Sequence, residues 1–453
     1  MGKLARYPFN EHSDELGVGS ESGSLVTSNN WKRLPLEDVL NFVRNGSSAK
    51  QNREGVGYPV TRIETISRDR IDPERVGYVA DLTEAEIEKH RLSVGDILFS
   101  HINSEPQIGR SVLYRGNPPF LIHGMNLLRL SPNGAICLPE FLDYQLRHLR
   151  RQGVFVALAA RAVGQSSINQ GKLKRVEIAL PSMQEQDAIA YILRTVQEAT
   201  EAAESVIAST RELKKSLMHH VFTYGPVPVA DAGEVPLKET EIGLVPEHWD
   251  VRLIGEVCDL STGTTPSTKE AHYYDGDVPF IKTSEIANNV IRHAQTHVSD
   301  EAVNDYRLKI YPPGTVFLAM YGQGKTRGQV GILDVAAATT QNTAAIAPRD
   351  GLDSRFLWFY LMSRYNMLRG EGVQGHISHL NLGFVKNLPV PVPSMAIQRQ
   401  VVSALAAVEH KISIEVQRST ALAALFQSLL HDLMTGKVRV TDLDTAVVAA
   451  GGG

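Results

Sequence analysis

The stretch Leu180-Pro181-Ser182-Met183 recurs as Val392-Pro393-Ser394-Met395, and each copy precedes a long run with helical periodicity. The offset of 212 residues between Leu180 and Val392 also relates pairs on both sides of this stretch: Asn169 and Asn381, Lys174 and Lys386, Gln186 and Gln398, and His219 and His431. Solenoid repeats have periods of only about 20–50 residues. The sequence therefore predicts a whole domain and a following helix, both used twice. A duplicated unit suits a target that presents two similar features.

The amino-acid composition limits the classes of protein to which the chain can belong. The 453 residues are 43% hydrophobic, which is ordinary for a globular protein of two to four domains. Cys137 and Cys258 lie far apart without metal-ligand spacing, which argues against a disulfide framework or a zinc site and fits a reducing compartment. No apolar run approaches the roughly 18 residues that a membrane span needs, and the first residues lack the apolar core of a secretion signal. We expect a cytoplasmic protein.

The net charge of −4 hides a segregation of charge along the chain. Residues 91–176 contain 11 Lys and Arg against 4 Asp and Glu, and residues 304–386 contain 9 against 5. Residues 226–256, between the two copies, contain 2 against 7. Each copy thus contains a basic stretch, which favours two surfaces that face a polyanion. Chance clustering of charge is the alternative.

Seven segments are expected from composition and periodicity. They are a flexible tail (1–30), a first domain (31–181), a long helix (182–222), a linker with four prolines (223–247), a second domain (248–393), a second long helix (394–436) and a C-terminal tail (437–453). Within each domain, short Gly-led β-rich runs precede a helical patch, and a strand closes the domain. This order is typical of an α+β domain with irregular, loop-bearing sheets.

The two long helices carry apolar residues at spacings of three and four. A stripe held over several heptads favours a coiled coil, and two separate surface helices are the alternative. Thr210 interrupts one stripe, and Glu415 and Ser419 interrupt the other. The residues expected to pair the helices are Ile189, Ile192, Val196, Leu213, Leu217, Leu405, Val408, Ile412, Leu425 and Leu429.

Catalytic motifs are weak. The run 319–326 satisfies a relaxed phosphate-loop pattern, but two glycines and a valine follow it, which favours a turn into a strand over the helix that cradles phosphates. His376 and His379 lie three apart in a loop without nearby carboxylates, so a metal site is not expected. Asn117-Pro118-Pro119-Phe120 fits the methyltransferase box only formally, because no cofactor loop precedes it. We expect a protein without catalytic residues or a metal.

Polar side chains suited to nucleic acid cluster at corresponding places in the two copies. Gln and Asn can contact adenine through two hydrogen bonds, and Arg or Lys can contact guanine. Ordinary solvated loops are the alternative. The candidate DNA-contacting residues are Arg110, Gln165, Ser166, Ser167, Asn169, Lys172, Thr264, Thr265, Lys282, Gln323, Lys325, Thr326, Arg327, Gln374, His376 and His379.

A set of motifs in the second copy is specific in combination. It consists of Ile242-Gly243, Val245-Pro246, His248-Trp249, Gly263-Thr264-Thr265-Pro266, Tyr273-Tyr274-Asp275-Gly276-Asp277, Val392-Pro393, Gln398 and Thr435-Gly436-Lys437. Together they resemble the target-recognition domains of the specificity subunits of Type I restriction-modification enzymes, and the resemblance covers residues 31–440. The first copy departs from the pattern, because Trp31 lacks the upstream Ile-Gly motif and Gly46-Ser47-Ser48-Ala49 replaces the Gly-Thr-x-Pro loop.

This resemblance implies two target-recognition domains separated by two long helices that pair antiparallel. It implies a bipartite site in double-stranded DNA, with each domain reading one half. It further implies a non-catalytic chain that recruits two methyltransferase subunits, which use S-adenosylmethionine, and two restriction subunits, which use ATP and magnesium. A methylation-only system, a fused-nuclease relative and a coiled-coil scaffold that binds only protein remain alternatives.

Overall fold

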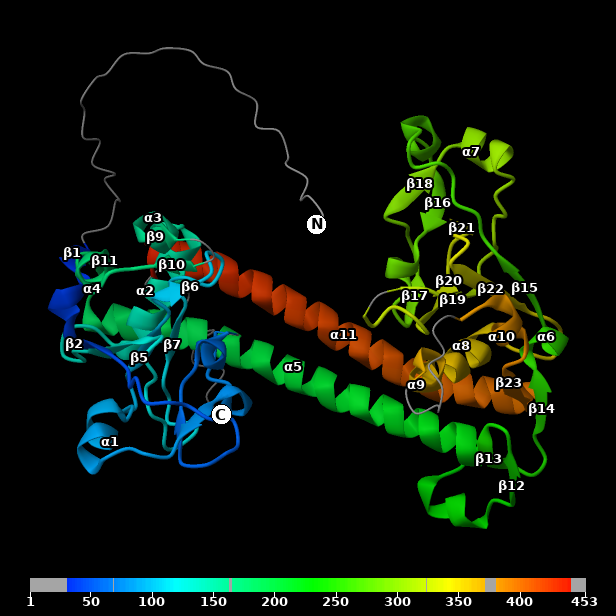
Figure 1. Cartoon of the computed structure of the whole chain (residues 1–453), viewed down its shortest axis with the longest axis horizontal. Coiled ribbons are helices and arrows are strands. Elements are labelled where there is room, and N and C mark those ends of the chain that lie inside the picture. The colour runs from blue at the N-terminus through cyan, green and yellow to red at the C-terminus, as the bar shows by residue number, and fades with distance from the viewer. Residues whose placement is uncertain (1–30, 68, 163–164, 323, 371–379, 441–453) are drawn as a thin grey trace. The chain divides into compact units, whose positions relative to one another are not determined.

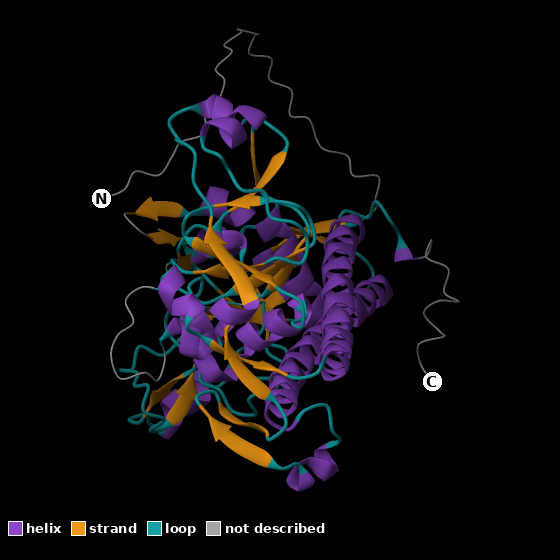
Figure 2. Ribbon diagram, turned by 90° about the vertical axis from the view of Figure 1, so that its right-hand side faces the viewer, coloured by secondary structure: helices purple, strands orange, loops and turns teal. Residues whose placement is uncertain are grey.

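The computed structural model describes residues 31–67, 69–162, 165–322, 324–370 and 380–440. The chain divides into two compact units, with boundaries between residues 199 and 200 and between residues 421 and 422, so that the first unit contains both ends of the described chain (Figure 1). Each unit combines helices with small sheets. Figure 2 shows the helices and strands of the chain in separate colours. No helix in these ranges is both long and apolar enough to cross a membrane.

The first unit is built on a four-stranded antiparallel sheet with the order β2-β8-β5-β7. These strands are β2 (Leu40–Asn45), β5 (Ile97–Phe99), β7 (Ser111–Leu113) and β8 (Leu128–Pro132). The remaining strands form small sheets: β1 (Lys32–Pro35) with β11 (Glu177–Leu180), β3 (Tyr58–Val60) with β4 (Gly77–Val79), and β6 (Ile102–Asn103) with β10 (Gln165–Ser167) and β9 (Ala160–Ala162).

Short helices complete the first unit. They are η1 (Leu36–Val39), η2 (Ile63–Ile66), η3 (Pro73–Arg75), α1 (Glu84–His90), α2 (Pro139–Arg151), α3 (Val154–Leu158) and α4 (Gln170–Lys174). The helix α2 packs on β7 and presents Phe141, Leu142 and Leu146 to the core. The predicted helical patch therefore supplies one side of the hydrophobic core.

The second unit is built on a five-stranded sheet with the order β15-β22-β19-β20-β17. These strands are β15 (Cys258–Thr262), β17 (Asn289–Ile291), β19 (Val316–Ala319), β20 (Val330–Leu333) and β22 (Thr343–Pro348). The smaller sheets join β14 (Asp250–Leu253) with β23 (Pro389–Val392), β12 (Leu237–Thr240) with β13 (Gly243–Pro246), and β16 (Val278–Ile281) with β18 (Thr296–Val298) and β21 (Ala338–Thr339).

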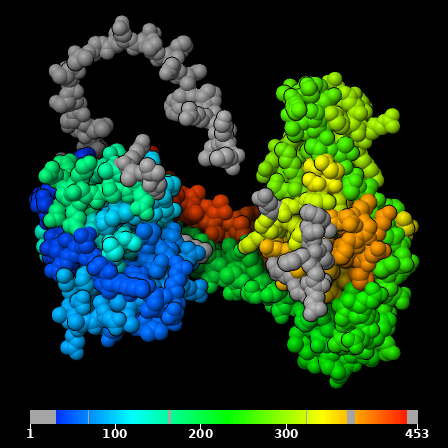
Figure 3. Space-filling view, in the orientation of Figure 1, coloured from blue at the N-terminus to red at the C-terminus, as the bar shows by residue number. Residues whose placement is uncertain are grey.

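The helices of the second unit are η4 (Val229–Glu234), α6 (Ile254–Val257), η5 (Ala271–Tyr274), η6 (Thr283–Glu285), α7 (Asp300–Asp305), α8 (Ser354–Ser363), α9 (Tyr365–Arg369) and α10 (Leu382–Lys386). The helix α8 packs on β19, β20 and β22 as α2 packs on β7 in the first unit. In the space-filling view, the orange segment that contains α10 and β23 lies at the surface of this unit (Figure 3).

The strand order confirms the predicted duplication. The order β2-β8-β5-β7 of the first unit has its counterpart in β15-β22-β19-β20 of the second. In both units the entry strand pairs antiparallel with the closing strand, β1 with β11 and β14 with β23. The first unit therefore has the same entry strand as the second, although its entry motifs depart from the family pattern.

Glycines shape the corresponding strand starts. Gly95, Gly109, Gly314 and Gly328 all have positive φ angles, between 74° and 96°, a backbone region that favours glycine. Gly109 also lies so close to Phe155 that an added Cβ would stand 2.4 Å from its ring. The Gly-led runs of the sequence are therefore turns that direct the chain into β5, β7, β19 and β20.

The long helices α5 (Met183–Tyr224) and α11 (Met395–Met434) begin and end within two residues of the predicted bounds. Along α11, buried or half-buried residues recur at alternating spacings of three and four. They are residues 398, 401, 405, 408, 412, 415, 419, 422, 426, 429 and 433. Glu415 is only 4% exposed and accepts a hydrogen bond from Lys411, so the polar residues lie within the stripe and do not interrupt it.

Two of the expected pairing residues are exposed. Leu213 is 57% exposed and Leu425 is 46% exposed, so their assignment to a buried seam was wrong. On α5 the buried positions near Leu213 are Ala203, Ile207 and Met218. The apolar pattern does not mark the buried face here, because the half-buried positions of this stretch include the polar Thr210 and Lys214.

The segment expected to be a linker has regular structure. Beyond the end of α5 it contains η4 and the hairpin β12–β13, in which Leu237 pairs with Pro246 and Thr240 with Gly243. Pro236 and Pro246 lie beside or at the ends of these strands, where proline is tolerated. The expected C-terminal tail also begins as ordered chain, since Val438 and Val440 pack on the core of the first unit. Residues 1–30 and 441–453 lie outside the described residues.

Candidate DNA interface

The first unit presents polar side chains on β10. The alternation of side chains along a strand places Gln165 and Ser167 on the exposed face, whereas Ser166 is only 6% exposed. The strand pairs with β6, and Ile168 donates a backbone hydrogen bond of 2.8 Å to His101 beyond it. Two of these three candidates are therefore available to a ligand, and Ser166 belongs to the interior.

Other candidates of the first unit have partners within the protein. The side-chain oxygen of Asn169 accepts a 2.7 Å hydrogen bond from the backbone of Gly171 and caps α4. Lys172 on α4 donates to the carbonyl of Leu158 at 3.4 Å. The guanidinium of Arg110 is paired with Asp69 at 2.5 Å and is mostly buried. These side chains thus already contribute to local structure.

The second unit gathers polar loops at one end of its sheets. Pairing of Thr262 with Ala344 and of Ala319 with Thr343 brings the loop after β15, the loop after β19 and the connection from β21 to β22 together. Thr264 is exposed, and Thr265 donates a hydrogen bond to Gln341 in that connection. Lys282 is exposed directly after β16, which is parallel to β21.

The candidates Lys325, Thr326 and Arg327 lie in the turn between β19 and β20. These strands are antiparallel neighbours, so the described residues between them belong to a hairpin connection and form no helix of the kind that a phosphate loop requires. Tyr365 donates a 2.7 Å hydrogen bond to the Lys325 carbonyl, and Arg327 donates to the Arg369 carbonyl. The turn therefore rests on α9 with the Lys325 side chain exposed.

Some candidates cannot be placed, and another was missed. Gln323, Gln374, His376 and His379 lie outside the described residues. Gln341 was not expected at the polar loops of the second unit. The available signal for Gln341 was the polar run Thr339-Thr340-Gln341-Asn342-Thr343 between two small-residue strands.

Several arginines of the basic stretch in the first unit are paired with carboxylates within the fold. Arg129 pairs with Asp96 at 2.7 Å in the interior, and Arg147 pairs with Asp143 at 2.7 Å. Arg115 pairs with Glu140. These arginines therefore already have carboxylate partners within the fold.

One histidine and both cysteines are buried and have strongly altered pKa values. Burial lowers the pKa of His123 to about 3, and it raises the pKa of both Cys137 and Cys258 to about 12, so both thiols stay protonated. In the described ranges, no group of three or more His, Cys, Asp or Glu side chains is arranged to hold a metal ion. These groups offer no activated nucleophile.

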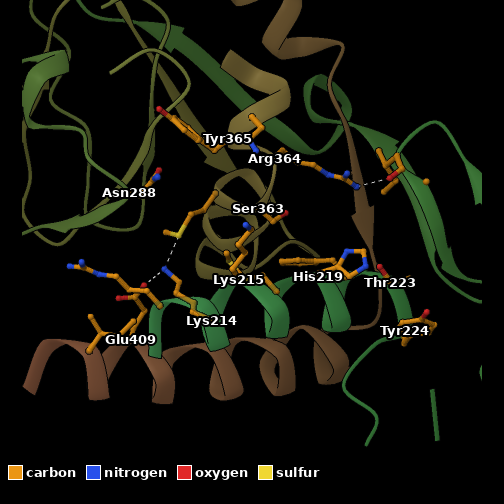
Figure 4. Close-up of a pocket in the computed structure, with 18 of the residues that line it drawn as sticks. Lys214, Lys215, His219, Thr223, Tyr224, Asn288, Ser363, Arg364, Tyr365 and Glu409 are labelled. Atoms are coloured by element: carbon orange, nitrogen blue, oxygen red, sulfur yellow. Dashed lines mark hydrogen bonds and ion pairs between the residues drawn. The ribbon is translucent and has the colours of Figure 1, made fainter. Parts of the chain in front are cut away.

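A cavity of about 930 Å³ in the second unit is lined by α5, β13, α8 and α9 (Figure 4). Lys214 extends from α5, bonds to Glu409 of α11 and lies 2.9 Å from the sulfur of Met362. Arg364 donates a 2.6 Å hydrogen bond to the Ile242 carbonyl. The side chains of Lys215 and His219 also line the cavity. The charged side chains that line the cavity are therefore mainly cationic, and Lys214 is paired there with Glu409.

Comparison with known proteins identifies the duplicated domain. The family described as the Type I restriction modification DNA specificity domain matches residues 28–208 and again residues 246–424. A putative Type I restriction enzyme MjaX specificity subunit from Methanocaldococcus jannaschii is 34% identical over 420 residues, covering 90% of this chain and 94% of the relative.

Solved structures have the same fold. The crystal structure of a Type I restriction-modification S subunit from M. genitalium superposes with a TM-score of 0.59 at 16% identity, covering 90% of this chain and 97% of that one. A second structure, which describes complex assembly and conformational transition of the type I R-M system, superposes with a TM-score of 0.52 at 16% identity. The match covers 90% of this chain and 98% of that one. The chain belongs to the Type I restriction-modification specificity subunits and contains two recognition domains.

Proposed function

We propose that this chain reads a bipartite site in double-stranded DNA, one half with each unit. The observation that carries the proposal is the repeated fold, in which equivalent sheets occur twice and each is accompanied by exposed polar side chains. Gln165 and Ser167 would serve the first half-site, and Thr264, Lys282 and Lys325 the second. Side chains on loops and on the exposed face of a strand can enter the major groove, where base pairs are distinguishable.

The long helices would pair antiparallel as a coiled coil and set the spacing of the half-sites. Two contacts, one in each unit, support this proposal. The start of α5 meets the chain just after α11 through a 2.7 Å ion pair between Glu185 and Arg439. The end of α5 meets the first half of α11 through the pair of Lys214 and Glu409. A helix of 42 residues is about 63 Å long, more than the roughly 34–36 Å of one turn of DNA.

The chain would act without catalysing a reaction itself, in the cytoplasm of a prokaryote. Two methyltransferase subunits would supply S-adenosylmethionine chemistry, and two restriction subunits would use ATP and magnesium. The buried cysteines with raised pKa values and the antiparallel pairing of β19 with β20, where a phosphate loop would need a helix, support a binding role. The exposed apolar residues Val206, Leu213 and Ile414 on α5 and α11 offer surface for such partners.

Methylome sequencing tests this function. A host that expresses the chain with its cognate methyltransferase subunits should acquire adenine methylation at one gapped, two-part motif, and deletion of the chain alone should abolish it. The purified chain without partners should neither methylate nor cleave DNA. A methylome that is unchanged by the deletion would contradict the proposal. If the complex also failed to shift duplex DNA in a gel at low salt, a scaffold that binds only protein would be favoured.

A further inference from the structure

The loop from Thr339 to Thr343 holds an exposed glutamine on a rigid base. Thr339 and Thr343 are buried, and the hydroxyl of Thr339 donates a 2.8 Å hydrogen bond to the carbonyl of Ile281. The backbone closes a turn from Thr343 to Thr340 at 3.2 Å, and Met320 donates to the Asn342 carbonyl at 2.9 Å. Gln341 is exposed at the tip of this anchored turn.

A second loop fixes the orientation of the Gln341 side chain. The hydroxyl of Thr265 donates a hydrogen bond to Oε1 of Gln341. The loop that contains Thr265 is itself pressed against the first loop, because a Cβ on Gly263 would stand 1.8 Å from the Thr339 carbonyl oxygen. On its other side, Tyr274 donates a 2.9 Å hydrogen bond to the Pro266 carbonyl. Thr265 is thus held at a defined place beside the amide.

The Gln341 amide keeps hydrogen-bond donors and an acceptor that a ligand can use. Oε1 keeps a second lone pair, and Nε2 keeps two hydrogens. In the described part of the chain, no further hydrogen bond to this amide occurs. An acceptor beside a donor matches the edge of adenine in the major groove, which presents the N6 amino group beside N7. Lys282, exposed at the same end of the sheets, is suited to a phosphate.

We propose that Gln341, oriented by Thr265, reads one adenine in the half-site of the second unit. The proposal rests on the proposed function, since it requires that this unit bind DNA. Thr265 acts as a positioning residue because its hydroxyl holds the amide and need not touch the base. A preoriented amide loses less side-chain entropy on binding than a free one.

The test uses the full chain in complex with its methyltransferase subunits. Once methylome sequencing has given the motif, binding is measured by competition with duplexes that carry each base pair in turn at every position of both half-sites. Gln341→Glu removes the amide donor and adds an acceptor, which suits the N4 amino group of cytosine. It should lower the preference for A·T at one position of one half-site by about tenfold or more and shift it toward C·G.

Two further variants make the result specific. Thr265→Val keeps the shape and removes the hydroxyl, so it should weaken the same preference by a smaller factor without favouring C·G. Gln295→Glu applies the Gln341 substitution to another exposed glutamine of this unit and should leave every preference unchanged. The other half-site serves as an internal control for each variant.

The outcomes separate this inference from the proposed function. If the wild-type complex methylates a gapped motif but Gln341→Glu leaves all base preferences unchanged, or lowers binding equally for all four base pairs, Gln341 reads no base. That result would leave the proposed function intact. If the wild-type complex shows no two-part motif at all, both proposals are wrong.

Discussion

Gln186 and Gln398, which are 212 residues apart, are buried and make the same three hydrogen bonds in the two units. The amide of Gln186 donates to the carbonyls of Ile136 at 3.2 Å and Pro181 at 3.1 Å, and its oxygen accepts from the Leu138 backbone at 2.9 Å. The amide of Gln398 donates to the carbonyls of Gly351 and Pro393 at 2.9 and 2.8 Å, and its oxygen accepts from the Asp353 backbone at 2.7 Å. Each glutamine therefore ties the first turn of a long helix to the closing strand and to the loop before α2 or α8.

Replacing either glutamine with alanine should destabilise its own unit. Gln398→Ala leaves an N–H and two carbonyl groups unpaired in the interior, which costs about 2–4 kcal/mol of unfolding free energy. Hydrogen exchange should accelerate in the second unit with little change in the first, and Gln186→Ala should give the reverse. Gln400→Ala and Gln184→Ala change exposed glutamines two residues away and serve as matched controls. Equal acceleration in both units by Gln398→Ala would contradict the assignment.

The buried histidine of α2 should make the first unit sensitive to acid. Burial, followed by the nearby His431 and Arg151, lowers the pKa of His148 to about 4, whereas an unfolded histidine titrates near 6.5. Between these values the unfolded chain binds more protons, so stability falls as pH decreases from about 6.5 to 4, by up to about 3 kcal/mol. His148→Gln should flatten this part of the pH profile of unfolding. The exposed His410→Gln should retain the wild-type slope.

The seam of α5 should follow burial and not hydrophobicity alone. Ile207 is 8% exposed and Leu213 is 57% exposed. Ile207→Ala should therefore lower the unfolding free energy by about 2–4 kcal/mol, whereas Leu213→Ala should change it by less than about 0.5 kcal/mol. Denaturant unfolding of the two variants compares them directly. A larger loss for Leu213→Ala would place the seam on the other face of the helix.

The sequence specified the repeated elements because local chemistry determines them. Positive-φ glycines mark the starts of β5 and β19, and the absence of Gly and Pro marks α5. The hairpin β12–β13 was missed because its prolines suggested a linker, although they stand where strand pairing permits them. The pairing face of the helices was predicted from the apolar pattern, whereas the polar Thr210 and Lys214 occupy part of the half-buried face.

The candidate site was less predictable because the same residue types serve structure and recognition. Asn169 has a side chain suited to adenine, yet its oxygen caps α4. Arg110 pairs with Asp69, 41 residues earlier in the chain, and Gln341 is oriented by Thr265, 76 residues away. Such partners are brought together only by the sheet, so single-sequence patterns cannot distinguish an available side chain from an engaged one.

Exchange of one recognition domain should change one half of the DNA site. Each unit has its own sheet and closing strand, so residues 31–180 of another family member should fold in place of the native segment. Methylome sequencing of the chimeric complex should then report a new first half-site with the second half-site and the gap unchanged. A change in both half-sites would show that the two domains do not read independently.

The lengths of α5 and α11 should set the spacing of the half-sites. Inserting four residues between Ala199 and Ala203 in α5, and four after Ser419 in α11, adds about 6 Å and roughly one turn to each helix. A four-residue insertion slightly unwinds a coiled coil without inverting its apolar face. The gap in the motif should therefore lengthen by one or two base pairs of about 3.4 Å each, and the half-site sequences should not change because no base-reading loop is altered. The same four residues inserted at Gly233, where nothing lies within 4 Å of an added Cβ, should leave the gap unchanged. Methylome sequencing reads both quantities at once, and an active double-insertion complex with its original gap would mean that α5 and α11 do not set the spacing.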